Sequence, residues 1–186
     1  MTNLLDVDWS TIPAPEDDGG ADHLKGLVVP DVVLMASDGR EVSLAQLEGR
    51  TVVYAYPMTG TPGTPLPDGW DMIPGARGCT PQSCAFRDHD AELKALGVRQ
   101  LFGLSTQTSV AQREAAERLH LPFALLSDRD CALADAMRLP TFIVDAQRMI
   151  KRVTLVIDDG RVAHAFYPVF PPDEAAATVV RWLRDA

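Results

Sequence analysis

The sequence lacks the marks of an exported or membrane protein. Its first residues carry acids where a signal peptide has lysine or arginine, and no long apolar region follows before Pro13. Later apolar stretches are too short to cross a bilayer, because residues 27–35, for example, are interrupted by Pro30 and Asp31. We therefore expect no membrane segment and a cytoplasmic compartment in which thiols stay reduced.

Positive charge is also scarce. The chain has 17 lysines and arginines against 26 aspartates and glutamates, a formal net charge of −9 at pH 7. A field of this sign repels phosphate backbones and anionic lipid headgroups, so we expect neither nucleic acid nor a membrane as a partner. With 186 residues, 46% apolar and 23% charged, the chain has the length and composition of one globular domain.

Cysteine is rare, with three residues in the chain. A protein of this length does not need disulfides to fold, so Cys79, Cys84 and the isolated Cys131 are not expected to form a structural framework. The histidines show no zinc-ligand spacing with the cysteine pair, and the fourth cysteine of an iron–sulfur site is missing. Glycine-rich phosphate motifs and G-x-S-x-G are absent as well. We expect no cofactor and no metal.

The order of apolar patterns indicates one α/β domain behind an extension. Residues 1–26 are polar, with prolines, acids and glycines but no apolar period. After them, strands alternate with helices, and we expect a mixed central sheet flanked by helices over residues 27–186. The expected strands lie near 32–34, 51–56, 101–104, 123–126, 142–144, 151–157 and 162–166, the last two joined in a hairpin by the turn Asp158-Asp159-Gly160. The expected helices span 80–97, 109–120, 130–137 and 173–182, the last capped by Asp173.

Residues 57–78 break every periodicity. They hold five prolines and five glycines, with Trp70, Met72 and Ile73 as apolar anchors. A loop of this length inside a compact domain is typically functional or disordered.

Cys79 directly precedes a predicted helix start. Thr80 can cap the free amides, and Pro81 has no amide to lose at the first helical position. The positive end of the helix dipole stabilises a thiolate over a thiol, and a nearby arginine such as Arg77 would add to this effect. The alternative is an inert loop cysteine, which the helix start and the neighbouring second cysteine make the weaker interpretation.

Cys84 falls one turn into the same predicted helix. If both cysteines are helical, their Cα atoms are about 8–9 Å apart, beyond the disulfide limit of about 7 Å. A Cys79–Cys84 bond then requires the first turn to unwind, which favours a catalytic disulfide over a permanent one. Taken alone, Cys84 is also compatible with a buried core cysteine, as is Cys131.

The segment GCTPQSCAFRD at residues 78–88 resembles the G-C-T-x-x-x-C-x-x-R-D signature of atypical two-cysteine peroxiredoxins of the Q, or bacterioferritin-comigratory, type. Further segments match in order across roughly residues 27–186, namely 38–47, 54–57, 103–106, 125–128 and 151–158. The resemblance implies a thioredoxin-like (peroxiredoxin) fold.

The resemblance also implies an activity, an antioxidant thiol-dependent peroxidase that reduces hydrogen peroxide or organic hydroperoxides. Cys79 would be the peroxidatic cysteine, which passes through a sulfenic acid, and Cys84 the resolving cysteine that condenses with it. Arg152 would orient thiolate and peroxide. The implied partners are a peroxide and thioredoxin or a similar dithiol reductant, and the implied assembly is a monomer or a homodimer.

The loop departs from the family pattern Pro-x-x-x-Thr-x-x-Cys. Pro57 and Thr61 keep the first spacing, but Thr64 stands in the place of the cysteine and Ala76 stands three residues before Cys79. The chain therefore carries an insertion of about fifteen residues.

Two questions follow from this insertion. In the family pattern the threonine hydroxyl hydrogen-bonds the peroxide and the thiolate. Here either Thr61 or Thr59 folds back to supply that hydroxyl, or neither does and the activity is weak. The insertion either lies over the active-site mouth or a subunit contact and filters substrates, or is a surface loop anchored by its own side chains. Two other functions stay open: a thioredoxin-like disulfide oxidoreductase, although those use C-x-x-C, and a non-enzymatic redox sensor.

Overall fold

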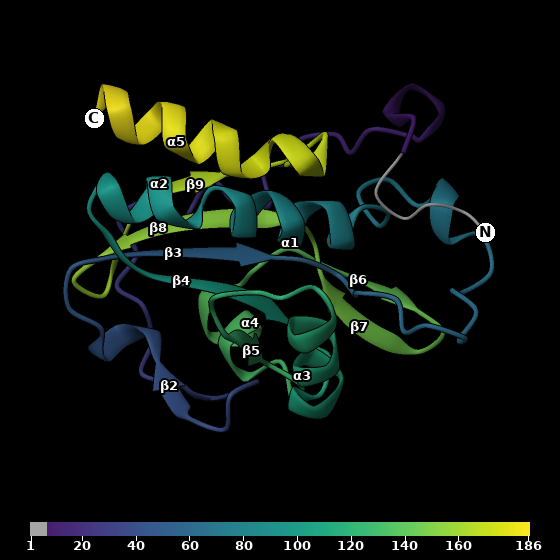
Figure 1. Ribbon diagram of the computed structural model, residues 1–186, viewed down its shortest axis with the longest axis horizontal. Helices are drawn as coiled ribbons and strands as arrows, with labels where there is room; N and C mark the ends of the chain where they lie inside the picture. The colour runs from purple at the N-terminus through teal and green to yellow at the C-terminus, as the bar shows by residue number, and fades with distance from the viewer. Residues whose placement is uncertain (1–6) are drawn as a thin grey trace.

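The computed structural model describes residues 7–186 (Figure 1), so the signal-peptide expectation for residues 1–6 lies outside the described part. Within residues 7–186, no helix is long and apolar enough to cross a membrane. A seven-stranded mixed sheet forms the centre, in the order β2-β1-β5-β4-β3-β8-β9. Its strands are β1 (Val33–Ala36), β2 (Glu41–Ser43), β3 (Arg50–Ala55), β4 (Val98–Ser105), β5 (Leu125–Ser127), β8 (Val153–Asp158) and β9 (Arg161–Phe166).

Strand pairing follows the predicted α/β arrangement. The neighbours β3, β4 and β5 run parallel, and the remaining pairs are antiparallel. A separate hairpin joins β6 (Thr141–Val144) and β7 (Gln147–Ile150). The predicted hairpin around Asp158-Asp159-Gly160 is confirmed by the antiparallel pair β8–β9.

Helices cover both faces of the sheet. The helices are α1 (Cys79–Asp88), α2 (Asp90–Ala95), α3 (Ser109–Arg118), α4 (Ala132–Met137) and α5 (Ala175–Asp185). In Figure 1, α1, α2 and α5 lie on one side of the strands, while α4 lies on the other. Each side has its own cluster of buried apolar side chains. The predicted single helix over 80–97 is wrong, because the backbone leaves helical geometry at His89 and two helices result.

Alternation along β8 decides which side chains reach α1. Val153, Leu155 and Ile157 belong to the cluster on the α4 side, and Val156 belongs to the cluster under α1 and α5. Successive side chains of an extended chain point to opposite faces, so Arg152, just before the strand, faces the α1 side like Val156. The strand register thereby carries a charged residue beneath the helix that begins with Cys79.

Candidate active site

Helix α1 begins at Cys79 itself, and the residue that precedes it is Gly78. The predicted cap by Thr80 is wrong, because Gly78 holds the N-cap position with a left-handed φ of 104° and no side chain caps the helix. A Cβ on Gly78 would come within 2.3 Å of Pro172 and 2.7 Å of Trp9. Glycine is therefore required here both by the backbone angle and by the close approach of two side chains.

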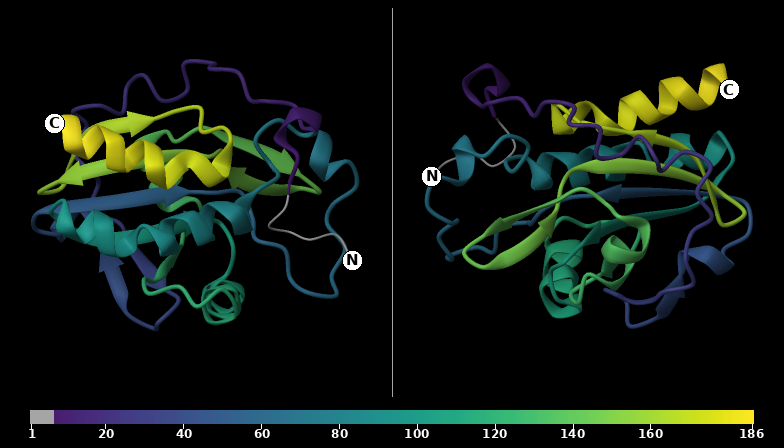
Figure 2. Two further views of the ribbon diagram at one scale, coloured as in Figure 1. Left: turned by 45° about the horizontal axis from the view of Figure 1, so that its top comes forward. Right: turned by 180° about the vertical axis from the view of Figure 1, so that it is seen from behind.

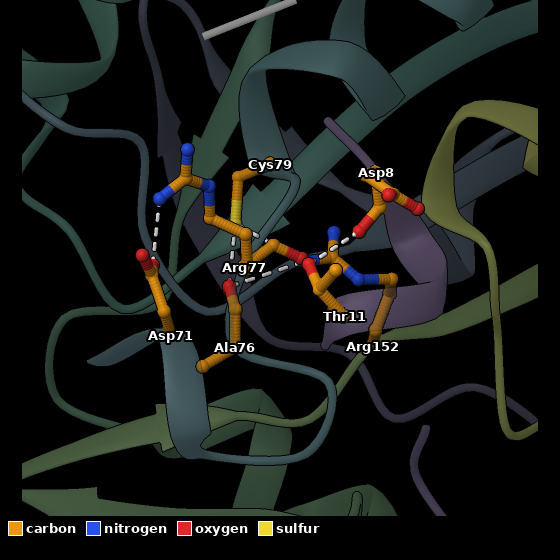
Figure 3. Close-up of polar contacts among 7 residues, drawn as sticks. All are labelled: Asp8, Thr11, Asp71, Ala76, Arg77, Cys79 and Arg152. Atoms are coloured by element: carbon orange, nitrogen blue, oxygen red, sulfur yellow. Dashed lines mark hydrogen bonds and ion pairs between the residues drawn. The ribbon is translucent and has the colours of Figure 1, made fainter. Parts of the chain in front are cut away.

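Cys79 and Arg152 meet beneath the first turn of α1 (Figure 3). The Sγ atom lies 3.4 Å from Nη2 of Arg152 and 3.6 Å from the carbonyl oxygen of Ala76. Both side chains are buried, Cys79 at 4% and Arg152 at 3% exposure. The two residues are 73 positions apart in sequence, and β8 and α1 bring them together.

Arg152 is held by a ring of acceptors. Its Nη1 donates to Oε1 of Gln82, and its Nη2 lies 3.1–3.3 Å from the carbonyl oxygens of residues 75–77. In the described part of the chain, Arg152 has no carboxylate partner, since none of the ion pairs there includes it. A buried cation is costly without an anion, and the Cys79 sulfur is the group beside it that can become one.

Sequence reasoning missed Gln82 as a partner of Arg152. Gln82 is fully buried and stands one turn after Cys79 on α1. Its position three residues after the cysteine was the available signal, because residues at that spacing share a helix face. Arg77, considered as an aid to the thiolate, instead pairs with Asp71 at 2.6 Å, while its backbone carbonyl accepts from Arg152.

Cys84 lies in α1 as well. Both cysteines are therefore helical, which is the condition under which we expected their Cα atoms to be too far apart for a disulfide. Both are free thiols and both are buried. Burial raises the pKa of the Cys84 thiol, and the nearby Arg87 partly opposes that increase. A bond between the two sulfurs therefore requires the first turn of α1 to open.

The two candidate threonines differ in their surroundings. Thr61 is exposed and lines a cleft of about 620 Å³ together with Cys79. Thr59 is buried, and its hydroxyl donates to Oε1 of Gln107 at 3.1 Å. Thr59 lines a neighbouring cavity with Thr61, but not the cleft that Cys79 lines.

The insertion forms one wall of this cleft. Its lining comes from the insertion on one side and from the start of α1 on the other: Met58, Gly60, Thr61, Pro62, Gly63, Thr64, Leu66, Trp70 and Arg77, then Gly78, Cys79, Thr80 and Pro81. Trp70 is buried, and it packs with Ala76 and with Met149 of β7. Of the other two predicted anchors, Ile73 packs against this cluster, whereas Met72 is 68% exposed.

Comparison with known proteins decides the family, since the profile of the Redoxin family matches residues 24–180. The chain belongs to the redoxin family. It is similar to peroxiredoxin Bcp of Escherichia coli K12, with 32% identity over 165 residues that cover 86% of this chain and 95% of that protein. Chloroplastic peroxiredoxin Q of Oryza sativa subsp. japonica is 31% identical over 162 residues and 86% of this chain, which spans only 66% of that relative's length.

Solved redoxin structures agree with the observed architecture. Peroxidoxin BcpB from Mycobacterium tuberculosis superposes with a TM-score of 0.70 at 28% identity, covering 88% of this chain and 98% of that one. Peroxiredoxin Q from Xanthomonas campestris superposes with a TM-score of 0.67 at 23% identity, covering 88% and 96%. These structures confirm the predicted thioredoxin-like fold. The 32% identity to peroxiredoxin Bcp over 95% of that protein confirms the predicted resemblance to the Q and Bcp type of peroxiredoxin.

The extension of this redoxin reaches the same site from another direction. Figure 2 shows the N-terminal segment running along the β9 side of the molecule, where residues 26–29 exchange backbone hydrogen bonds with β9 and its turn. Trp9 Nε1 donates to Asp173 at 2.9 Å, and the Trp9 ring meets Phe170 edge to face. The predicted cap of the last helix by Asp173 is wrong. The Asp173 carboxylate accepts the hydrogen bond from Trp9, and α5 begins at Ala175 without a side-chain cap.

Cys131 and the remaining ligating groups stand apart from the site. Cys131 is buried in the apolar cluster on the α4 side, and burial raises the pKa of its thiol. Among residues 7–186, no group of three His, Cys, Asp or Glu side chains has an arrangement that would hold a metal ion.

Proposed function

We propose that this redoxin is a thiol-dependent peroxidase in which Cys79 is the peroxidatic cysteine. The observation that carries the proposal is the buried Arg152 guanidinium, which has no carboxylate partner in residues 7–186 and lies 3.4 Å from the Cys79 sulfur. The sulfur stands at the positive end of a ten-residue helix and lines an accessible cleft. A thiolate formed there would face the Arg152 guanidinium and the first turn of α1.

The reaction balances with these groups and a peroxide. The Cys79 thiolate attacks one peroxide oxygen, and the O–O bond breaks. The departing oxygen takes a proton and leaves as water or an alcohol, and Cys79 becomes a sulfenic acid. Arg152 holds the sulfur and stabilises the negative charge that shifts from sulfur to the leaving oxygen.

Cys84 completes the cycle as the resolving cysteine. Its sulfur attacks the sulfenic sulfur, a disulfide forms, and one water leaves. The first turn of α1 opens for this step, and an external dithiol, thioredoxin or a similar protein, then reduces the disulfide. We propose a cytoplasmic compartment, with a monomer or a homodimer as the working form.

Thr61 is the candidate for the hydroxyl beside the peroxide. It shares the cleft with Cys79, whereas the Thr59 hydroxyl is engaged by Gln107. No threonine hydroxyl bonds to Cys79 among the hydrogen bonds of residues 7–186, so Thr61 would act on a bound peroxide rather than on the free thiolate.

A dithiol-coupled peroxidase assay tests the proposal on four proteins: wild type, Cys79→Ser, Cys84→Ser and Cys131→Ser. We expect Cys79→Ser to lose turnover by at least about a thousandfold, because an alcohol at this position is not ionised near neutral pH. Cys84→Ser should stop after one turnover with thioredoxin, leaving a sulfenic acid on Cys79 that dimedone labels. Cys131→Ser, a buried cysteine far from the site, is the matched control and should keep full turnover.

Other results would point to the alternative functions. Full turnover by Cys79→Ser overturns the mechanism. Stoichiometric oxidation of wild type without turnover, with thioredoxin and peroxide in excess, indicates a redox sensor. Exchange of protein disulfides without peroxide consumption indicates a disulfide oxidoreductase.

A further inference from the structure

Thr61 is exposed, but the backbone just before it is held by the side chain of Gln107. Oε1 of Gln107 accepts from the backbone amide of Thr59 at 2.9 Å and from the Thr59 hydroxyl at 3.1 Å. Nε2 of Gln107 donates to the backbone carbonyl of Thr59 at 3.0 Å. One side-chain amide thus uses both its acceptor and a donor on a single residue. We call these three bonds the loop clamp.

The loop clamp is anchored at the end of β4. The backbone amide of Gln107 donates to Oγ of Ser105 at 3.3 Å, and its carbonyl accepts from Oγ of Ser127 in β5 at 2.6 Å. Arg118, at the end of α3, adds a hydrogen bond from Nη2 to the carbonyl oxygen of Gly60 at 3.0 Å. The loop is therefore fixed at this point to the central sheet and to α3, and not only to its own side chains.

On the other side of Thr61 the chain turns back at once. The backbone amide of Thr64 donates to the carbonyl oxygen of Thr61 at 3.1 Å. Pro62 and Gly63 occupy the two central positions, with a φ of 78° at Gly63. Proline followed by a glycine with positive φ is the signature of a type II turn. The backbone of Thr61 is thus constrained from both directions, by the loop clamp before it and by this turn after it.

We infer that Gln107 is a positioning residue that holds the Thr61 hydroxyl at the cleft beside Cys79. The inference rests on the proposed peroxidase function, in which Thr61 acts on the bound peroxide. Thr61 lines both the cleft of Cys79 and the neighbouring cavity that Gln107 lines, so it connects the loop clamp with the cleft. A hydroxyl that is in place before the peroxide arrives loses little freedom in the transition state, and this raises the rate.

Two substitutions of Gln107 weaken the loop clamp in steps. Gln107→Met has nearly the same length and loses all three bonds to Thr59. Gln107→Glu keeps the two bonds that Oε1 accepts and loses the donor to the Thr59 carbonyl. Gln147→Met is the matched control, because Gln147 lines the same cavity from β7 and makes none of these bonds.

Stopped-flow fluorescence with hydrogen peroxide measures two steps, the oxidation of Cys79 and the disulfide formation that follows. We expect Gln107→Met to slow the oxidation about tenfold, Gln107→Glu about threefold and Gln147→Met less than about twofold. Disulfide formation should stay within about twofold of wild type in all three, because Thr61 takes no part in that step. A variant with a general folding defect would slow both steps.

The Thr61→Val background tests whether Gln107 acts through the threonine. This substitution keeps the shape of the side chain and removes the hydroxyl, and it should slow the oxidation at least about tenfold. Adding Gln107→Met in this background should cost less than about a further twofold, since the effects of residues that act as a unit do not add.

The outcomes separate this inference from the peroxidase proposal. A wild-type oxidation rate in Gln107→Met or in Thr61→Val overturns the positioning role and leaves the peroxidase function standing. An equal loss from Gln107→Met in both backgrounds, or a proportional loss in both steps, does the same. If wild type itself does not react with peroxide, the peroxidase function fails and the positioning role fails with it.

Discussion

Two segments without apolar periodicity, residues 7–20 of the extension and the loop at residues 57–78 that holds the insertion, both converge on the start of α1. Trp9 of the extension lies against Gly78, and the insertion carries its last carbonyls to Arg152. The segments also approach each other, since a Cβ on Gly75 would stand 3.5 Å from Pro15. The composition of the two is similar, but they are held in different ways.

The insertion has a small apolar cluster of its own, and the extension has none. Trp70, Ala76 and Met149 are buried together, with Phe142 of β6 packed against them. Ala21 and Leu24, near the end of the extension, are buried in the core. Residues 7–20 bury no side chain and depend on a few polar and aromatic contacts, chiefly those of Trp9 and of Asp18, which accepts from Lys151 and Tyr167. Burial resists opening more strongly than exposed pairs do, so the insertion should behave as part of the domain and residues 7–20 as a detachable strap.

The largest effect is expected from Trp70→Ala. The ring is 4% exposed, and its loss should lower the free energy of unfolding by about 3 kcal/mol, the low end for a buried aromatic because the cluster is small and lies at the edge of the domain. Urea denaturation measures the change. Met72→Ala, on the exposed side of the same turn, should stay within about 0.5 kcal/mol of wild type. A small effect of Trp70→Ala would show that the cluster does not hold the insertion.

A smaller effect is expected from Trp9→Ala, and mainly in kinetics. The change removes the hydrogen bond to Asp173 and the contact with Phe170, together worth about 1–2 kcal/mol. Because Trp9 packs on Gly78, its release should ease the opening of the first turn of α1. Formation of the Cys79–Cys84 disulfide after one equivalent of peroxide should then be up to about tenfold faster.

Trp9→Phe provides the control for this prediction. It keeps a ring against Gly78 but loses the indole donor, so its rate should fall between those of wild type and Trp9→Ala. An unchanged rate in Trp9→Ala would mean that the strap does not restrain the helix start.

The smallest effect concerns Asp18 and pH. Hydrogen bonds from Lys151 and Tyr167 lower the pKa of the Asp18 carboxyl from 3.8 to about 2. A group with a lowered folded-state pKa contributes stability above its unfolded pKa and loses it as the pH falls, here between about pH 4 and pH 2. The contribution is at most about 1 kcal/mol, since water screens this exposed pair.

The comparison of Asp18→Asn with wild type measures this contribution. Their difference in free energy of unfolding should be constant above pH 5 and should shrink as the pH falls towards 2. Asp17→Asn is the control. Among the side-chain hydrogen bonds of residues 7–26, the Asp17 carboxylate accepts only from the backbone amide of Gly19. A difference that is the same at pH 2 as at pH 5 would contradict the assignment of this stability to the ionised Asp18 carboxylate.

Much of the fold and part of the site follow from local patterns. The helix that presents Cys79 and the hairpin around Gly160 were predictable because turn chemistry and apolar spacing act over a few residues. The helix start was displaced by two residues, since Gly78 takes the cap position that Thr80 was expected to hold. The break at His89 was not predictable, because neither proline nor glycine marks it.

The sequence by itself determined the family, because the motif at residues 78–88 is a local pattern. It also proposed Cys79 and Cys84 from the helix start and the motif, and Arg152 from the family resemblance. Only the tertiary structure decided how residues 73 positions apart meet and which threonine shares the cleft with Cys79. It also decided that the loop at residues 57–78, with buried apolar side chains, and residues 7–20, with surface pairs, flank the start of α1. Contacts between distant segments depend on strand register and close packing, which no local pattern records.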